Sequence, residues 1–185
     1  MPYIQVIEHA ESTGELRGIY DYLIATRGKL ADVHKIQSLN PPALLSHMNL
    51  YKDVMFGQSP LKRYQREMLA VVVSQVNQCK YCMLHHREAL MHYWKNEERV
   101  NYLLADSSAA QLSSEDKALC DFAKELTTGP DRVTSERIDA LRSVGFEDRT
   151  ILDATLVISY FNFVNRIVLA LGLELNSSEI GGYKY

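Results

Sequence analysis

The sequence lacks the features of a secreted, nucleic-acid-binding or membrane-inserted protein. It has three cysteines, an odd number that does not make the disulfide framework of a small secreted protein. Its formal net charge of −3 leaves no excess of positive charge for nucleic acid or an anionic membrane surface. The first residues contain neither the basic nor the apolar stretch of a signal peptide. We therefore expect a cytoplasmic protein with neither nucleic acid nor membrane as a partner.

The sequence also lacks strand patterns. No run of four to eight residues alternates cleanly between apolar and polar side chains, so no sheet is predicted. Apolar residues recur instead at helical spacing, and 46% hydrophobic and 23% charged residues are values typical of globular proteins. The 185 residues are enough to bury a sizeable core. The sequence predicts an all-α fold, a single domain over residues 1–185 with about eight helices.

Capping residues, prolines and glycines set the expected helix boundaries. Ser12 to Glu15 form a predicted capping box, Asn40 is a predicted N-cap, and Gly28 is a predicted helix stop. The C-terminal tail, 176–185, is expected to be flexible. The expected helices cover about 12–28, 41–57, 59–77, 80–93, 97–105, 114–127, 134–143 and 147–171, with a short helical turn at 32–36.

The most apolar stretch, residues 151–173, is long enough to cross a bilayer. It also contains Asp153, Asn162, Asn165 and Arg166, which would be costly in a membrane. A buried core helix is therefore the better interpretation. We expect its asparagines and arginine to hydrogen-bond neighbouring helices or a subunit interface rather than a substrate.

Reactive side chains gather in the segment that contains two of the cysteines. Cys79 and Cys82 form a Cys-x-x-Cys pair, whose thiols can interconvert between dithiol and disulfide with little chain movement. At about 100° per residue, His86 falls on the same apolar helix face as both cysteines. We expect the thiols in a partly desolvated pocket, with His86 able to accept a proton, and His85 and His92 pointing elsewhere.

Glu67 is the second element of this pattern. If the chain turns back after Asn77, Glu67 and His86 arrive about 15 Å and about 10–12 Å below the turn, at 1.5 Å per residue. A carboxylate beside an imidazole orients it as a base for a nucleophile. The start of a helix adds about 0.3–1 kcal/mol in favour of a nearby thiolate.

The same residues also fit plainer roles. Cys79 and Cys82 could be inert buried thiols, or could bind a metal together with His86 and either His85 or Glu67. A c-type haem site is excluded, because Met83 and not histidine follows the second cysteine. Further alternatives are a Glu67 paired with Arg166 or Tyr64, a His86 that is only a core histidine, and a Cys120 on the polar face of its helix, at a possible interface.

The segment from Glu67 to His86, with a glutamate twelve residues before Cys79 and a histidine four residues after Cys82, resembles a known family. It is similar to the alkylhydroperoxidase D core of the carboxymuconolactone decarboxylase-like family. The helical layout and the late segment 161–166 look like the longer, peroxidase-related branch, so the resemblance covers most of the chain.

The resemblance implies an oxidoreductase of alkylhydroperoxidase or peroxiredoxin type that reduces H₂O₂ or organic hydroperoxides. Cys82 would attack the peroxide, Cys79 would resolve the product as a disulfide, and Glu67 and His86 would relay protons. Tyr81 stands where peroxidase members of the family often have histidine, and is expected to be a packing residue at the pocket edge.

The same resemblance implies a homo-oligomer whose disulfide is re-reduced by a small dithiol carrier, such as protein-bound lipoamide. No haem, flavin or metal is expected as a cofactor. The alternatives are a redox sensor or scaffold without turnover, and a non-redox, decarboxylase-like activity on the same fold.

Overall fold

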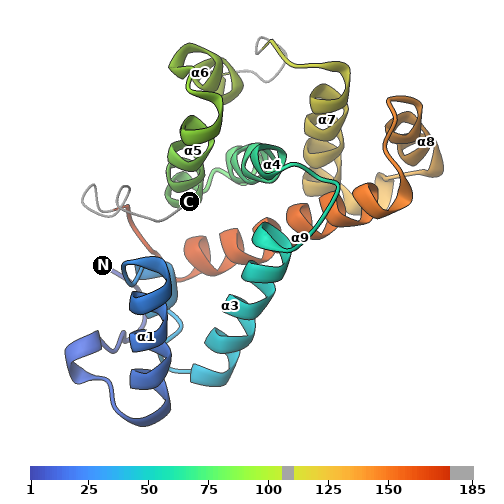
Figure 1. Cartoon of the computed structure of the whole chain (residues 1–185). Helices are drawn as coiled ribbons and strands as arrows, with labels where there is room; N and C mark the ends of the chain where they lie inside the picture. Colours follow the sequence, from blue (N-terminus) through green and yellow to red (C-terminus); the bar gives the residue numbers. More distant parts are fainter. Residues whose placement is uncertain (106–110, 176–185) are drawn as a thin grey trace.

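The structure, a computed structural model, describes residues 1–105 and 111–175, and all regular elements within these ranges are helical (Figure 1). The all-α prediction is confirmed, and the short turn expected at 32–36 is the four-residue α2. The tail, 176–185, lies outside the described residues. The helices are α1 (Gly14–Arg27), α2 (Asp32–Lys35), α3 (Pro41–Phe56), α4 (Arg63–Val76), α5 (Lys80–Trp94), α6 (Glu97–Ala105), α7 (Ser114–Thr128), α8 (Ser135–Ser143) and α9 (Asp148–Ala170).

Helix α4 is the centre of the molecule. Every residue from 65 to 74 is buried, so the helix is enclosed on all sides. It packs against α5, α7 and α9, which surround it in Figure 1. The run of valine, leucine and alanine in its second half supplies the apolar surface. Polar side chains on such a helix must find partners inside the protein, and Glu67 is one of them.

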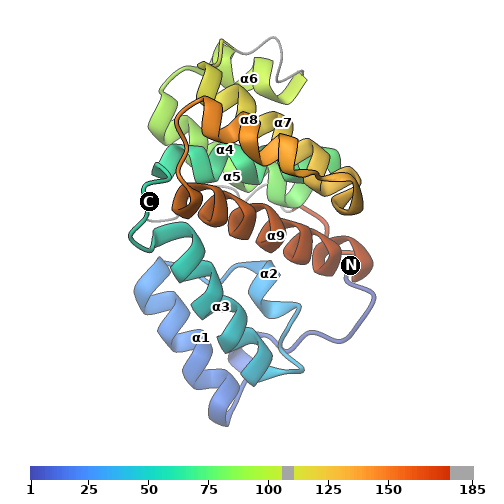
Figure 2. The same ribbon diagram turned by 90° about the vertical axis from the view of Figure 1, so that its right-hand side faces the viewer.

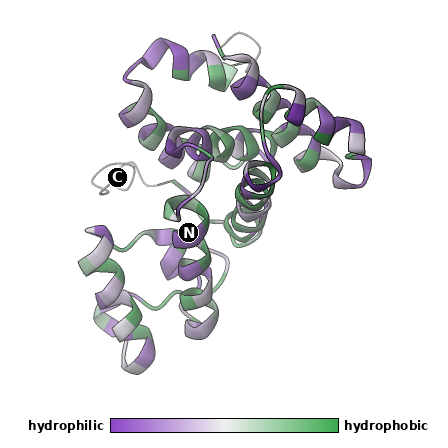
Figure 3. Cartoon of the chain, turned by 45° about the vertical axis from the view of Figure 1, so that its right-hand side comes forward, coloured by the Kyte–Doolittle hydropathy of each residue, from purple (hydrophilic) through white to green (hydrophobic). Residues whose placement is uncertain are grey.

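Apolar side chains of the described residues form two clusters. The larger joins α4, α5, α7 and α9, whereas the smaller joins α1 and α3. In Figure 2, α9 crosses the molecule between the layer of α4, α5 and α7 and the group of α1, α2 and α3. In Figure 3 the helices at the periphery of the molecule show both purple, hydrophilic residues and green, hydrophobic residues, as amphipathic helices do. The smaller cluster contains Leu16, Ile19, Tyr20, Leu23, Leu44 and Met48.

Among the described helices, α9 is long and apolar enough to cross a membrane, by length and composition alone. Half of its most apolar 18-residue stretch is buried in the protein. One of its faces packs into the larger cluster, as the sequence predicted. The other face leaves Leu152, Leu156, Phe163 and Leu169 exposed.

The helix ends agree with the predicted caps in two cases out of three. Asn40 accepts a hydrogen bond from the backbone N–H of Ala43 at 3.2 Å, and Gly28 ends α1 in the left-handed conformation, with φ +85°. The capping box predicted at Ser12 is wrong. Its hydroxyl donates to the carbonyl of His9 at 2.7 Å, because a preceding turn of 3₁₀ helix brings that carbonyl within reach.

Candidate active site

A tight turn between α4 and α5 positions the two cysteines. Gln78 adopts a positive φ of 57°, which is uncommon for a residue with a side chain. The N–H of Cys79 then donates to the carbonyl of Ser74 at 2.8 Å. Cys79 becomes the N-cap of α5, and Cys82 lies in the first turn of that helix. Both thiols therefore sit at the positive end of the α5 dipole, as expected.

Glu67 and His86 meet as the sequence predicted. Nδ1 of His86 lies 2.5 Å from Oε2 of Glu67, and Glu67 is only 1% exposed. The other carboxylate oxygen lies 2.5 Å from the guanidinium of Arg63, one turn earlier on α4. The alternative partners are wrong, because Tyr64 donates to Asp116 and Arg166 donates to Asn162.

Two neighbours, His86 and Arg63, decide the charge of Glu67. Burial opposes its ionisation, but the charges and hydrogen bonds of His86 and Arg63 outweigh burial and hold the pKa of Glu67 below its ordinary value. An ionised Glu67 accepts only, so Nδ1 of His86 must carry the hydrogen. In a neutral imidazole this leaves the lone pair on Nε2, where it can accept a proton.

The thiols of Cys79 and Cys82 are buried and share a hydrogen bond. That bond lowers the pKa of Cys79 although burial opposes the shift, whereas the same bond and burial raise the pKa of Cys82 well above its ordinary value. The pair thus titrates as a unit, whose first proton leaves more easily than that of a lone thiol. The dipole alone would favour ionisation of both cysteines, so the raised pKa of Cys82 corrects that simpler expectation.

Asn165 on α9 is a further contact of the cysteine pair. It is fully buried, and its side chain donates to the hydroxyl of Ser74 at 3.2 Å. A hydrogen bond from Asn165 to Cys82 partly offsets the rise in the pKa of Cys82. The sequence predicted that Asn165 contacts neighbouring helices, which is confirmed for α4, but it gave no sign of the contact with the thiol.

A cavity of about 90 Å³ opens beside Cys82, at the place where the group of α1, α2 and α3 meets α4, α5 and α9. Cys82, His86 and Glu67 all line it, whereas Cys79 does not. The volume suits a small organic molecule or several waters. The remaining lining residues are Arg27, Ala31, Val33, His34, His47, Tyr51, Arg63, Tyr81, His85, Ala89, Tyr160, Phe161 and Val164.

A chain of hydrogen bonds on the far wall of this cavity fixes the tautomer of His47. Gln37 donates its amide N–H to the carbonyl of Val33 at 2.7 Å, so its oxygen accepts from Nδ1 of His47 at 3.0 Å. Nε2 of His47 is then an acceptor, and the hydroxyl of Tyr160 donates to it at 2.6 Å. Burial lowers the pKa of His47 to about 4, so the imidazole is neutral at neutral pH.

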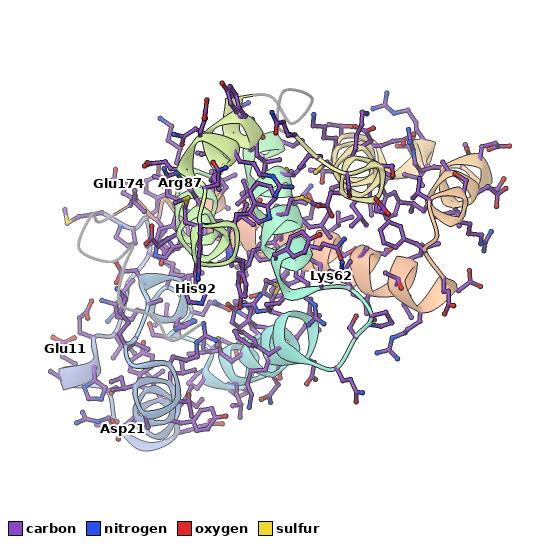
Figure 4. All side chains as sticks on the ribbon, turned by 45° about the horizontal axis from the view of Figure 1, so that its top comes forward. Glu11, Asp21, Lys62, Arg87, His92 and Glu174 are labelled. Carbon is purple, nitrogen blue, oxygen red and sulfur yellow. The ribbon has the colours of Figure 1, made fainter. Side chains whose placement is uncertain are left out.

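Of the two histidines predicted to point away from the cysteine pair, only His92 does so. His85 was expected to point elsewhere, but it lines the cavity, packs its ring 4.3 Å from that of Tyr81, and hydrogen-bonds the Tyr81 carbonyl at 2.8 Å. The reason is that the first turns of α5 are enclosed by the segment around Val33. His92 is exposed on α5, as predicted, and is labelled with Arg87 in Figure 4.

Tyr81 packs at the cavity edge, as the sequence predicted. It is 4% exposed, and its hydroxyl accepts a hydrogen bond from the backbone N–H of Val33 at 3.2 Å. The tyrosine thus ties α5 to the start of α2.

Cys120 does not lie on a polar, accessible face. It is fully buried, and burial raises its pKa to about 12. The larger apolar cluster includes it, because α7 turns this face toward α4. The interfacial role considered for Cys120 is therefore wrong for this structure.

Among residues 1–105 and 111–175, no group of three or more histidine, cysteine, aspartate or glutamate side chains is arranged to hold a metal ion. The predicted helix-bridging role of the polar residues in α9 is confirmed for Asn162, which accepts from Asn77 at 3.0 Å and donates to Thr127 at 3.1 Å.

The fold and the paired thiols define a helical protein of the alkylhydroperoxidase D type. The model of the carboxymuconolactone decarboxylase family matches residues 42–125, which include the whole segment from Glu67 to His86. The chain is 30% identical over 116 residues to YdfG of Bacillus subtilis (strain 168), covering 62% of this chain and 78% of that one. The chain belongs to the alkylhydroperoxidase D-like, carboxymuconolactone decarboxylase family.

Solved structures agree in fold over nearly the whole chain. The peroxidase-related protein from Silicibacter sp. TM1040 superposes with a TM-score of 0.87 at 28% identity, covering 97% of this chain and 94% of that one. The debrominase Bmp8 in complex with 2,3,4-tribromopyrrole has a TM-score of 0.79 at 15% identity, covering 95% and 92%. At that identity the second likeness concerns the fold alone.

Proposed function

We propose that the protein is a cysteine-based hydroperoxidase that cycles Cys79 and Cys82 between dithiol and disulfide. One observation carries the proposal: Cys82 faces the same cavity as His86, and His86 is held by Glu67 in the tautomer that can accept a proton. The family to which the chain belongs, with its peroxidase-related relative, supports the same reaction class.

The first step is attack by the Cys82 thiolate on the terminal oxygen of the hydroperoxide, the one that carries the hydrogen. Because one hydrogen bond joins the two sulfurs, moving its proton toward Cys79 puts the thiolate on the sulfur that faces the cavity. The S–O bond forms as the O–O bond breaks, and the sulfur is oxidised to sulfenic acid. His86, which holds the proton taken from the pair, returns it to the departing alkoxide to give the alcohol.

The second step forms the disulfide. The Cys79 sulfur attacks the sulfenic acid on Cys82, the S–S bond forms, and hydroxide leaves as water with the proton of the Cys79 thiol. An external dithiol, in our proposal a carrier such as protein-bound lipoamide, then supplies two electrons and two protons. We propose that the enzyme works as a homo-oligomer in the cytoplasm, without a haem, flavin or metal.

Peroxide turnover with a dithiol reductant tests the proposal. Cys82→Ser and Glu67→Gln should each lower turnover at least about tenfold, since a positioned proton carrier contributes about 10²–10⁴-fold. Cys120→Ser should leave turnover near the wild-type value, because Cys120 is buried in the core away from the cavity. Equal turnover by Glu67→Gln and wild type would remove the relay, and peptide mass mapping should find the disulfide between Cys79 and Cys82.

The alternatives predict different results in the same assay. A redox sensor would be oxidised once and stop, even with reductant present. A decarboxylase-like activity would survive replacement of both Cys79 and Cys82 by serine. Either result would contradict the peroxidase cycle.

A halogenated aromatic compound is a second candidate oxidant, because the rings of Tyr51, Tyr160 and Phe161 line the cavity beside Cys82. Reductive removal of bromide would convert the dithiol to a disulfide and replace the bromine of the ring by hydrogen. Release of one bromide per disulfide formed, from a bromopyrrole, would support it. Absence of bromide release under conditions of peroxide turnover would exclude it.

A further inference from the structure

One wall of the cavity carries a positive charge that no carboxylate in the described part of the chain neutralises. Arg27, the last residue of α1, is half-buried and lines the cavity. Its guanidinium lies 5.0 Å from the ring centre of Tyr51 and 5.1 Å from that of Phe56, and donates weakly to the Tyr51 hydroxyl at 3.3 Å. Within residues 1–105 and 111–175 it forms no ion pair with a carboxylate.

His34 lies on the same wall and has a polar atom without a partner. The residue is 7% exposed, and its Nδ1 makes no hydrogen bond to any described residue. Burial, reinforced by the neighbouring His47 and Arg27, lowers the pKa of His34 to about 3, so the ring is neutral at neutral pH. A buried polar atom left unpaired is unfavourable, and a ligand that hydrogen-bonds it would remove the cost.

The other charges in the cavity do not compensate Arg27. The charge of Arg63 is already paired with Glu67, and His34 and His47 are neutral. Glu67 is the carboxylate among the described lining residues, and it is already paired with Arg63 and His86, so none of these residues compensates Arg27. Phe161 and the tyrosines supply apolar surface in the same cavity as this charge and Cys82, which suits a carbon skeleton with a charged end.

We propose that Arg27 and His34 bind the anionic, oxygen-bearing head group of a small organic hydroperoxide, while its peroxide group meets Cys82. The inference rests on the proposed peroxidase function and names its substrate class. H₂O₂ has no such head group, so it gains nothing from this wall. Both residues precede the segment 42–125 that matches the family, so the subsite belongs to the N-terminal helices of this chain.

Binding of benzoate by the reduced, full-length protein tests the subsite without turnover. Benzoate carries the carboxylate, and benzyl alcohol is the neutral probe of similar size. In isothermal titration calorimetry, wild type should bind benzoate more tightly than benzyl alcohol. Arg27→Gln should weaken benzoate binding at least about tenfold, because a charge-assisted contact is lost. The matched control Arg142→Gln removes an exposed arginine on α8 and should bind like wild type.

A second variant and a second readout keep the test decisive. Arg27→Lys keeps the charge and should retain most of the preference for benzoate, even if the shape of the pocket changes slightly. Benzoate should also slow alkylation of Cys82 by iodoacetamide, followed by mass spectrometry. Equal benzoate binding by wild type and Arg27→Gln, no preference over benzyl alcohol, or unprotected Cys82 would each overturn the subsite.

Kinetics separate this inference from the proposed function. The ratio of kcat/KM for a carboxylate-bearing hydroperoxide to that for tert-butyl hydroperoxide should fall at least about tenfold in Arg27→Gln, in line with the loss of one charged contact. If wild type turns over neither compound, the peroxidase proposal fails, and the benzoate experiments still decide the subsite. If wild type turns over both with a ratio that Arg27→Gln does not change, the subsite is wrong and the peroxidase stands.

Discussion

The side-chain amide of Asn77 donates to Oδ1 of Asn165 at 3.0 Å, which joins the end of α4 to the C-terminal half of α9. Asn165 uses its own N–H groups for Ser74 and Cys82. One buried amide thus connects the turn before the cysteines, the helix that carries Glu67, and the sulfur that faces the cavity. The position of the thiol pair therefore depends on a helix that begins some seventy residues later in the sequence.

Replacement of Asn165 by alanine should affect both stability and thiol chemistry. It leaves the buried hydroxyl of Ser74 without this partner and removes one of the two hydrogen bonds of the Asn77 amide, which still donates to Asn162, so the free energy of unfolding should fall by about 1–3 kcal/mol. The pKa of the thiol pair should rise, because the hydrogen bond to Cys82 is lost. Urea denaturation and the pH dependence of alkylation measure the two effects. Asn49→Ala, on the exposed side of α3, should change neither.

The buried histidines should make stability depend on pH. The pKa of His47 is about 4 and that of His34 about 3 in the folded protein, whereas both are near 6.5 when unfolded. The unfolded state therefore binds more protons as pH falls below 6.5, and the free energy of unfolding should decrease by about 1.4 kcal/mol per pH unit for each histidine. Full stability from these groups is present above pH 6.5.

His47→Gln should remove the contribution of one histidine to the pH dependence of the free energy of unfolding. Urea denaturation at pH 7.5, 6.0 and 5.0 measures it, and His92→Gln on the surface of α5 is the matched control. An identical slope in His47→Gln and wild type would show that His47 is protonated, or exposed, in the folded protein.

Glu67 should make the stability of the fold depend on pH in a lower pH range than the histidines do. Its pKa in the folded protein lies below the ordinary value of 4.5, so its ion pairs stabilise the fold fully above pH 4.5 and are lost as pH falls through the folded pKa. Glu67→Gln should therefore show a shallower loss of stability below pH 4.5 than wild type. Acid titration followed by circular dichroism measures this, with Glu88→Gln on α5, which has no ion pair among the described residues, as the control.

Cys120 should be silent toward thiol reagents in the native protein. It is fully buried with a pKa of about 12, so it presents neither access nor thiolate at pH 7. Wild type and Cys120→Ser should react identically with a chromogenic disulfide when native, and differ by one thiol in denaturant. Reaction of Cys120 in the native protein would mean that α7 opens away from α4.

The core position of α4 predicts a large difference between two leucine substitutions. Leu69→Ala, at a fully buried site, should lower the free energy of unfolding by about 2–5 kcal/mol. Leu152→Ala, on the exposed face of α9, should change it by less than about 0.5 kcal/mol. Chemical denaturation measures both, and equal effects would mean that the exposed face of α9 is covered in solution.

The sequence predicted those features that depend on local spacing. Helix bounds followed from periodicity and from stops such as Gly28, and the meeting of Glu67 with His86 followed from their distances to the turn. Arg63 could have been found in the same way, since it lies one helical turn before Glu67. It does not stand out from the sequence, because arginine at this spacing is equally common on solvent-facing helix surfaces.

Local sequence spacing did not predict the residues on the other wall of the cavity. Arg27, His34, His47 and Tyr160 are scattered over more than a hundred residues, and only the packing of the N-terminal helices on α9 brings them together. The placement of His85 was wrong for the same reason, because a helical wheel for α5 does not include what covers it. Contacts between distant segments depend on tertiary packing, which one sequence does not reveal.

The division of the cavity between the two ends of the chain has a consequence for biosynthesis. The cysteines emerge from the ribosome before α9, so a nascent chain has Cys79 and Cys82 before it has the α9 side chains Tyr160, Phe161 and Val164 that line the cavity. The complete cavity beside Cys82 therefore forms only after α9 has been synthesised.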